Sequence, residues 1–331
     1  MDRPTIFDGD YGSLVRLVQK CLLSAPVDDI DGIFGPVTEE AVIQFQDKHN
    51  LASDGIVGPQ TWAKLEEVFD LPPYPTRMLE PLASDVIDEI ETAAAESDVA
   101  DLIWADDRGV APLAYTKGMA LAYATCVRKF ERGDMTAHEI ARGDNGDTNY
   151  DALALYRKEF MRIGMRTDVA GRETLRAVFV FLMGLGMRES SGEHCCGRDQ
   201  SAENVESDTC EAGLFQTSWN YHVCCTDAEM LFDEYRHALE GKEPQCQLTA
   251  FEDGVSCSGD DWENYGSGTG AEFQELSKVC PAFAVESAAI GIRNLRKHWG
   301  PIGRMEVRIV PEAEAMFSEI DAILAANGSV A

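Results

Sequence analysis

Apolar residues recur at intervals of three and four along most of the chain, the spacing of amphipathic helices rather than of strands. Connections rich in glycine and aspartate, such as ARGDNGDTN, separate these segments, and no run of alternating apolar and polar residues stands out. The pattern therefore predicts a mainly α fold. The predicted helices cover residues 84–96, 112–133, 151–165 and 172–189, with a further amphipathic helix in 280–300 that is expected to pack against the far wall of its domain.

The first seventy residues contain an internal repeat. DGIFGPVT at 31–38 returns as DGIVGPQT at 54–61. Each copy reads as an Asp-Gly turn that leads through Gly-Pro to a threonine expected to cap a helix. With the amphipathic segment SLVRLVQKCLL upstream, this predicts a compact bundle of three short helices. The domains are expected to be a small one at 1–70, a proline-rich linker at 71–83 and a larger one at 84–331.

The balance of charged residues limits the kinds of molecule that the protein can bind. The chain has 28 Lys and Arg against 58 Asp and Glu, a formal charge of −30. Because phosphate binding needs a basic surface, nucleic acid and anionic membranes are excluded as partners. The near-apolar run at 177–187 is too short to cross a bilayer, and the first residues show no basic or apolar leader. We therefore expect a soluble protein whose export uses a removed signal, a dedicated machine or host lysis.

Eight of the ten cysteines crowd into residues 195–280, whereas Cys21 and Cys126 stand in apolar helical surroundings that are typical of free thiols. An even number of cysteines in a loop-rich region favours disulfides and an oxidising compartment. Zinc is the alternative, but neither His194-Cys195-Cys196 nor His222-x-Cys224-Cys225 has the spacing of a zinc knuckle. We expect disulfides of open connectivity and no metal site.

Glu189 is the first candidate for chemistry. Leu175, Val178, Leu182, Leu185 and Glu189 follow one another at spacings of 3, 4, 3 and 4, so they share one helix face. Burial and the negative end of the helix dipole should both raise the pKa of Glu189. A carboxyl group that stays protonated near neutral pH is what a general acid requires. The alternative is a helix-end glutamate in solvent, or one paired with Arg188 or Arg198.

Two segments carry family resemblances. Residues 1–70 resemble the peptidoglycan-binding domain of cell-wall hydrolases, through the two D-G-I-x-G-P-x-T turns and the closing Thr61-Trp62-x-x-Leu65. Glu189-Ser-Ser-Gly, followed by Glu211-Ala-Gly-Leu-Phe-Gln, resembles the lysozyme superfamily, especially goose-type lysozymes and lytic transglycosylases. The resemblance implies a small three-helix peptidoglycan-binding domain and a larger lysozyme-like helical catalytic domain with disulfide-rich loops.

The same resemblance implies roles for single residues. Glu189 matches the catalytic acid of the family, and Gly213–Gln216 matches the segment that lines the glycan cleft. Some goose-type enzymes place an aspartate where this chain has Ser218, so the second carboxylate stays open. Candidates for it are Asp199 first, Glu211 second and Asp208 third. Substrate contacts are expected of Ser190, Gln216, Ser218, Trp219 and Tyr221.

These expectations combine into a modular, monomeric muramidase without a cofactor. It is expected to bind bacterial peptidoglycan and to cleave the β-1,4 bond between N-acetylmuramic acid and N-acetylglucosamine, from a secreted or periplasmic location at the wall. A lytic transglycosylase, a chitinase and an inactive wall-binding protein are the alternatives. Disulfides are expected to restrain the loop at 193–212, joining Cys195, Cys196 or Cys210 to Cys224 or Cys225.

Overall fold

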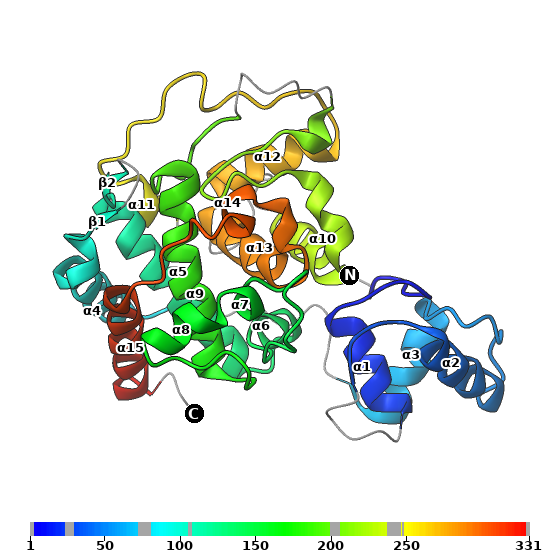
Figure 1. Ribbon diagram of the computed structural model, residues 1–331. Coiled ribbons are helices and arrows are strands. Elements are labelled where there is room, and N and C mark those ends of the chain that lie inside the picture. Colours follow the sequence, from blue (N-terminus) through cyan, green and yellow to red (C-terminus); the bar gives the residue numbers. More distant parts are fainter. Residues whose placement is uncertain are drawn as a thin grey trace. The chain divides into compact units, whose positions relative to one another are not determined.

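The computed structural model describes residues 3–23, 30–71, 81–104, 108–198, 206–236, 246 and 248–328, and these are mainly helical (Figure 1). Internal contacts group residues 1–78 with 222–230 as a small unit, and residues 79–221 with 231–331 as a large unit. Most of the predicted linker, and Asp199, lie outside the described residues. Within the described ranges, no helix combines the length and apolar character that crossing a membrane requires.

Three helices form the N-terminal part of the small unit: α1 (Ser13–Leu22), α2 (Pro36–Lys48) and α3 (Pro59–Phe69). Helices α2 and α3 each begin at the proline of the repeat, where the missing N–H group would have no partner in any helix. The expected threonine caps are therefore wrong. Thr38 and Thr61 lie inside the first turn, and each hydroxyl faces the carbonyl oxygen of the turn isoleucine five residues earlier.

One buried glutamine organises each repeat. The amide nitrogen of Gln19 donates to Asp31 Oδ1 (2.7 Å) and to the carbonyl oxygen of Ile33 (3.0 Å), while its Oε1 accepts from Gly32 N (2.8 Å). Gln46 makes the same set of bonds to the second turn, with Gly55 N at 3.0 Å from its Oε1. The repeat in the sequence is thus a repeat of one polar core, in which the glutamine satisfies a buried turn.

The large unit is built mostly from helices, with one short antiparallel hairpin in which Ile103 pairs with Val110. Two predicted helices differ from expectation, because residues 151–165 form two short helices and residues 280–300 form one helix with two short ones after it. The elements of this unit that lie before residue 172 are α4 (Ser84–Glu96), η2 (Asp98–Ala100), β1 (Ile103–Trp104), β2 (Gly109–Val110), α5 (Leu113–Glu131), α6 (Met135–Ile140), α7 (Ala152–Leu155) and α8 (Arg157–Arg162). The later elements are α9 (Arg172–Ser190), η3 (Ser207–Thr209), α11 (Leu248–Glu252), α12 (Thr269–Val279), α13 (Pro281–Asn294), η6 (Arg296–His298), α14 (Gly300–Gly303) and α15 (Pro311–Ala326). Two further elements, η4 (Trp219–Cys224) and α10 (Thr226–Tyr235), include residues that group with the small unit.

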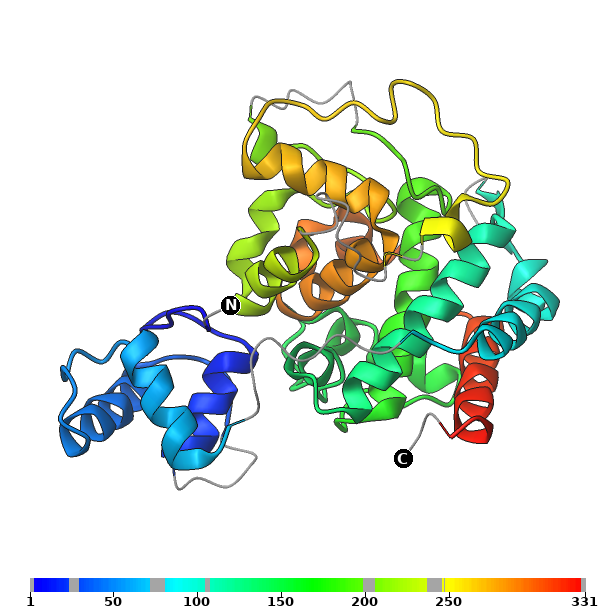
Figure 2. The same ribbon diagram turned by 180° about the vertical axis from the view of Figure 1, so that it is seen from behind.

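Helix α9 forms the centre of the large unit and packs against α5, α13 and α15 (Figures 1 and 2). Its predicted stripe from Leu175 to Leu185 is buried, but so are the other faces between Thr174 and Met187. Helix α13 is buried on every side from Pro281 to Arg293, so it is a core helix and the expected amphipathic outer wall is wrong. Its small residues explain this, because alanine and glycine allow neighbouring helices to approach on all faces.

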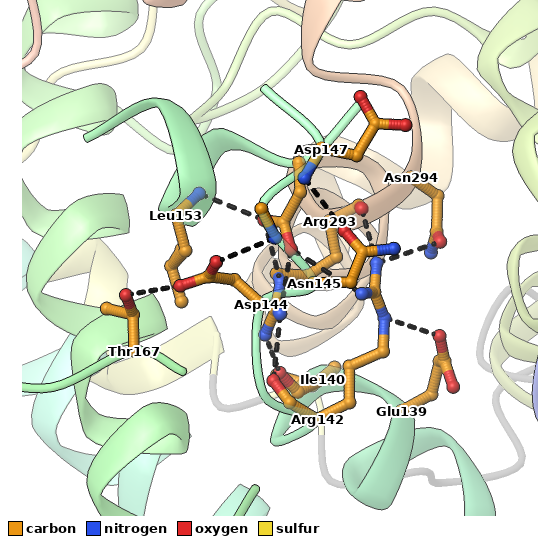
Figure 3. A network of polar contacts seen from close by, with 12 residues as sticks. Glu139, Ile140, Arg142, Asp144, Asn145, Asp147, Leu153, Thr167, Arg293 and Asn294 are labelled. Carbon is orange, nitrogen blue, oxygen red and sulfur yellow. Dashed lines mark hydrogen bonds and ion pairs between the residues drawn. The ribbon is translucent and has the colours of Figure 1, made fainter. Parts of the chain in front are cut away.

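A buried polar network holds the loop between α6 and α7 against the end of α13 (Figure 3). Arg293 is fully buried and bonds Asp151 through two nitrogens, at 3.0 and 2.9 Å. Arg293 also donates to the carbonyl oxygens of Ile140 and Arg142, which keeps its guanidinium satisfied. The loop that looked like an open, polar connection in the sequence is therefore fixed by a charge pair inside the protein.

Asp151→Asn is expected to lower the free energy of unfolding by about 3–5 kcal/mol, because it leaves the buried Arg293 charge without its partner. Asp168→Asn is the matched control, since Asp168 pairs with Arg166 at the surface, where such pairs contribute about 0–1 kcal/mol. Denaturant unfolding of both variants and the parent measures the effect. Equal losses in the two variants would show that the buried pair contributes no more than the surface pair.

Candidate active site

Glu189 lies in the last turn of α9, and the chain turns sharply just after it. Ser191 and Gly192 both have left-handed backbone conformations, with φ of 57° and 82°. Gly192 N bonds the carbonyl oxygen of Gly186, which closes the helix end. A Cβ at Gly192 would lie 2.8 Å from the Tyr115 ring, so only glycine fits here. The Ser-Ser-Gly sequence thus ends the helix one residue after Glu189, which places this carboxylate in the last turn of α9.

The surroundings of Glu189 suit an acid that holds its proton. Burial is the main cause that raises the pKa of Glu189, to about 7, and the negative charge of Glu211 adds to it. The positive charges of Arg188, Arg108 and Arg304 act in the opposite direction but do not cancel the shift. Glu189 therefore stands beside a second carboxylate in a mainly desolvated position, as a general acid near neutral pH requires.

The segment 213–216 returns beneath the end of α9. The hydroxyl of Ser190 donates to the carbonyl oxygen of Leu214 (2.8 Å), and Gly213 N donates to the carbonyl oxygen of Cys196 (2.8 Å). A Cβ at Gly213 would lie 2.6 Å from the carbonyl oxygen of Ser277 in α12, which explains the glycine. Ser190 is buried, so its hydroxyl fixes this segment to the end of α9.

The residues predicted to contact substrate differ in their burial and in the groups that they contact. The amide nitrogen of Gln216 donates to the carbonyl oxygens of Cys196 and Gly213, at 3.3 and 3.1 Å. Ser218 is buried, and Trp219 is half-buried against the rings of Phe232 and Phe273. Tyr221 has no exposed surface and its hydroxyl lies 2.5 Å from Ser287 Oγ, so its predicted contact with substrate is wrong. A large aromatic ring there fills the core instead.

Two residues outside the predicted set support the site. Trp299 is buried, and its Nε1 donates to the carbonyl oxygen of Phe215 at 2.8 Å. The neighbouring His298 faces Ser218 N at 3.5 Å, and burial lowers the pKa of this histidine to about 4. The sequence places both near the end of a predicted helix, with no spacing that connects them to residue 215. Only the fold brings them there.

Of the three candidates for the second carboxylate, Glu211 is the one whose charge is among the causes of the raised pKa of Glu189 within the described residues. Glu211 lies just before the glycine turn of the cleft segment, and its charge raises the pKa of Glu189. Asp208 lies in η3, where a Cβ added to Gly270 would meet its Oδ1 at 2.4 Å, so it packs against the start of α12. Asp199 falls outside the described residues and stays a prediction.

Two disulfides restrain the loops of the large unit, Cys195–Cys257 and Cys246–Cys280. The expected links from the loop at 193–212 to Cys224 or Cys225 are wrong. The chain around residue 197 packs instead against Asp261, whose Cα would lie 3.0 Å from a Cβ at Gly197. Cys195 therefore lies close to Cys257, with which it forms the disulfide. The remaining cysteines of the described chain are free thiols, namely Cys21, Cys126, Cys196, Cys210, Cys224 and Cys225.

One group of side chains has the composition of a metal site. The ligand atoms of His194, Cys195 and Cys257 all lie within 4.8 Å of one another. His194 is buried, its Nδ1 lies 3.0 Å from the carbonyl oxygen of Lys278, and its Nε2 faces the sulfur of Cys257 at 3.8 Å. With the two cysteines joined as a disulfide, neither sulfur is a thiolate ligand, so this group stabilises the loop as a covalent link.

Comparison with known proteins supports the predicted resemblance of the N-terminal residues to a peptidoglycan-binding domain. Residues 11–65 match the peptidoglycan binding domain family, so the small unit carries a peptidoglycan-binding domain. A protein of Kitasatospora aureofaciens described as "Uncharacterized protein in bpoA1 3'region" is 44% identical over 66 residues, which are 19% of this chain and 56% of that protein. The "Zinc D-Ala-D-Ala carboxypeptidase" of Streptomyces albus G is 40% identical over 70 residues, which are 20% of this chain and 28% of that one. Each match spans less than two thirds of the relative.

Among solved structures, the endolysin of Burkholderia phage AP3 aligns over 97% of this chain and 99% of its own, at 17% identity and a TM-score of 0.18. A TM-score this low carries no argument about shared fold or activity. What is established is thus a mainly helical, disulfide-bonded protein with an N-terminal domain that binds peptidoglycan.

Proposed function

We propose that the chain is a muramidase, a glycoside hydrolase that cleaves the β-1,4 bond between N-acetylmuramic acid and N-acetylglucosamine in peptidoglycan. The observation that carries the proposal is Glu189, a largely buried carboxyl group at the end of α9 whose pKa is raised to about 7 by burial and by the charge of Glu211. A pair of carboxylates, one protonated and one ionised, is the requirement for glycoside hydrolysis.

The roles follow from the surroundings. Glu189 donates its proton to the leaving glycosidic oxygen, since burial keeps that proton in place near neutral pH. Glu211, or Asp199 as first predicted, activates the attacking water as the ionised partner. The peptidoglycan-binding domain holds the enzyme on its insoluble substrate, which raises the local concentration of glycan at the site.

Mass spectrometry of the fragments that the full-length protein releases from purified peptidoglycan tests this proposal. Reducing N-acetylmuramic acid ends are the expected products. Anhydromuramic ends would identify a lytic transglycosylase, in which the sugar's own hydroxyl replaces water. Free peptides would indicate a peptidase, cleavage of chitin in preference to the wall would indicate a chitinase, and no soluble product would leave a binding protein.

The pH dependence gives a second test. An acid with a pKa of about 7 is mostly protonated below pH 7 and mostly ionised above it, so activity is expected to fall as pH rises through 7. At one unit above the pKa, about a tenth of the molecules keep the proton, and the rate at pH 8 should be about a tenth of its plateau. Initial rates on soluble glycan strands from pH 5 to 9 measure this. A rate that stays level up to pH 9 would exclude Glu189 as the acid.

A further inference from the structure

A pocket opens beside Glu189, between the β1–β2 hairpin, one face of α9 and the chain that follows α14. Its cavity volume is about 10 Å³, room for about one water-sized group, within a hollow of about 220 Å³ that includes open solvent. Gly184 allows α9 to approach the chain after α14, because a Cβ there would lie 2.3 Å from the carbonyl oxygen of Arg308. The lining residues are Trp104, Arg108, Gly184, Met187, Arg188, Glu306 and Arg308. The pocket adjoins the catalytic candidate, since Arg188 and Arg108 both influence the pKa of Glu189.

Three arginines line this pocket, and among the described residues only Arg188 has an acidic partner. Arg188 bonds Glu306 through two nitrogens, at 3.1 and 2.9 Å. Arg108 donates to Ser191 Oγ (3.1 Å) and Arg308 to the carbonyl oxygen of Ile103 (2.9 Å), and neither has an ion pair within the part of the chain that the structure describes. A guanidinium carries five N–H donors, so most donors of both groups stay available. In a chain with 30 excess negative charges, this leaves a place for an anion from outside.

Trp104 adds a donor of a different kind. Its side chain is 4% exposed, and its Nε1 is buried without an acceptor among the described residues. The indole N–H can only donate, and leaving it unpaired costs free energy that a ligand oxygen would recover. The guanidinium of Arg308 lies over the same ring, 5.7 Å from its centroid. Arg108, Arg308 and Trp104 therefore present donors, whereas the acidic lining residue, Glu306, accepts bonds from Arg188 and Arg304.

We propose that this pocket, which we call the stem-peptide pocket, binds a carboxylate of the peptide attached to the N-acetylmuramic acid residue. A carboxylate is planar and accepts two parallel bonds, which fits an arginine better than a neutral amide does. The inference rests on the proposed function, because the peptide is carried by the sugar whose bond Glu189 is proposed to protonate. Its consequence is a preference for glycan whose peptides carry free carboxylates over glycan whose carboxylates are blocked.

Isothermal titration with two matched probes tests the pocket. The protein carries Glu189→Gln, so that the probe is not consumed. One probe is soluble peptide-bearing glycan strands, and the other is the same strands with their carboxylates converted to primary amides. The free carboxylates are expected to bind about tenfold more tightly, the size of a charge-assisted contact. The net charge of −30 acts the other way and repels the anionic probe, so a preference for it must come from a local site.

Variants then assign the preference to these residues. Arg308→Gln and, separately, Trp104→Phe are expected to reduce the tenfold difference to about twofold or less, because each removes donors from the pocket. Trp104→Phe keeps an aromatic ring for Arg308 to lie over and removes the indole N–H group. If Arg308→Gln does not fold, Trp104→Phe alone tests whether the preference for free carboxylates comes from this pocket. Arg162→Gln is the control, since it removes the same charge from an exposed side chain on α8 and should leave the difference unchanged.

Equal affinity for the two probes would overturn the proposal, as would a preference that persists in both pocket variants. Displacement of the probe by inorganic phosphate at lower concentration than by acetate would assign the pocket to wall phosphates and overturn the peptide assignment. Failure of the proposed function is separable from this. Amidation-sensitive binding without glycan cleavage would refute the muramidase and keep the pocket, and cleavage without that sensitivity would do the reverse.

Discussion

Replacing Glu189 by glutamine is expected to reduce the release of glycan fragments by about 10²–10⁴-fold, the usual contribution of a general acid. Glutamine has nearly the same shape as glutamate but has no proton to donate to the leaving oxygen. The measurement is the initial rate on soluble glycan strands at pH 6, where Glu189 is mostly protonated in the parent. A rate within a few-fold of the parent would refute Glu189 as the acid.

The stability of the same variant provides its internal control. Because burial raises the pKa of Glu189 from 4.5 to about 7, the stability that its protonation contributes is fully present below pH 4.5, is lost as pH rises from 4.5 through 7, and does not change further above that range. Glu189→Gln has nothing to ionise, so its melting temperature relative to the parent should rise from pH 4.5 to about 7 and then stay level up to pH 9. This trend separates loss of chemistry from loss of fold. A variant that melts lower at every pH would mean that Glu189 has a structural role.

Replacing Glu211 by glutamine is expected to have the second largest effect, a fall of roughly 10²-fold in hydrolysis if it activates water. It is also expected to move the alkaline limb of the pH profile to lower pH, because the charge of Glu211 is one cause of the raised pKa of Glu189. Both changes are read from the same set of initial rates between pH 5 and 9. The direction of the shift is fixed by electrostatics and does not depend on which group activates water.

Glu193→Gln is the matched control for this experiment. Glu193 is an exposed carboxylate after the same helix, and it is not among the causes of the pKa shift of Glu189, so neither rate nor pH profile should change. A Glu211→Gln enzyme that keeps its full rate but shows the shifted profile would limit Glu211 to an electrostatic role. The water-activating group would then be sought at Asp199, or the reaction would be the one that needs no second carboxylate.

The sequence predicted the elements whose signals are local. Helix α9 was expected at 172–189 and is found at Arg172–Ser190, because an uninterrupted apolar pattern specifies a buried helix and Ser-Ser-Gly ends it. The repeat at 31–38 and 54–61 marked two equivalent turns, and residues 11–65 match a peptidoglycan-binding domain. The carboxylate at the end of α9 was also visible, since spacing alone places it on the face of Leu185.

Contacts between residues far apart in the chain could not be predicted from these local patterns. The partner of Cys195, the burial of Tyr221 and the bond from Trp299 to Phe215 are set by how loops pack over α12 and α13. A pattern of apolar positions fixes which face of a helix is buried but not which neighbour covers it, because many neighbours bury the same area.

The charges show the same division most clearly. The sequence determined a net charge of −30, a helix that ends in Glu189 and a domain repeat, all of which are properties of composition or of neighbouring residues. Only the tertiary structure decided that Arg293 is neutralised inside the core by Asp151, whereas Arg108 and Arg308 line one pocket beside Glu189. The physical reason is that electrostatic effects depend on distance and burial, which the order of residues does not contain.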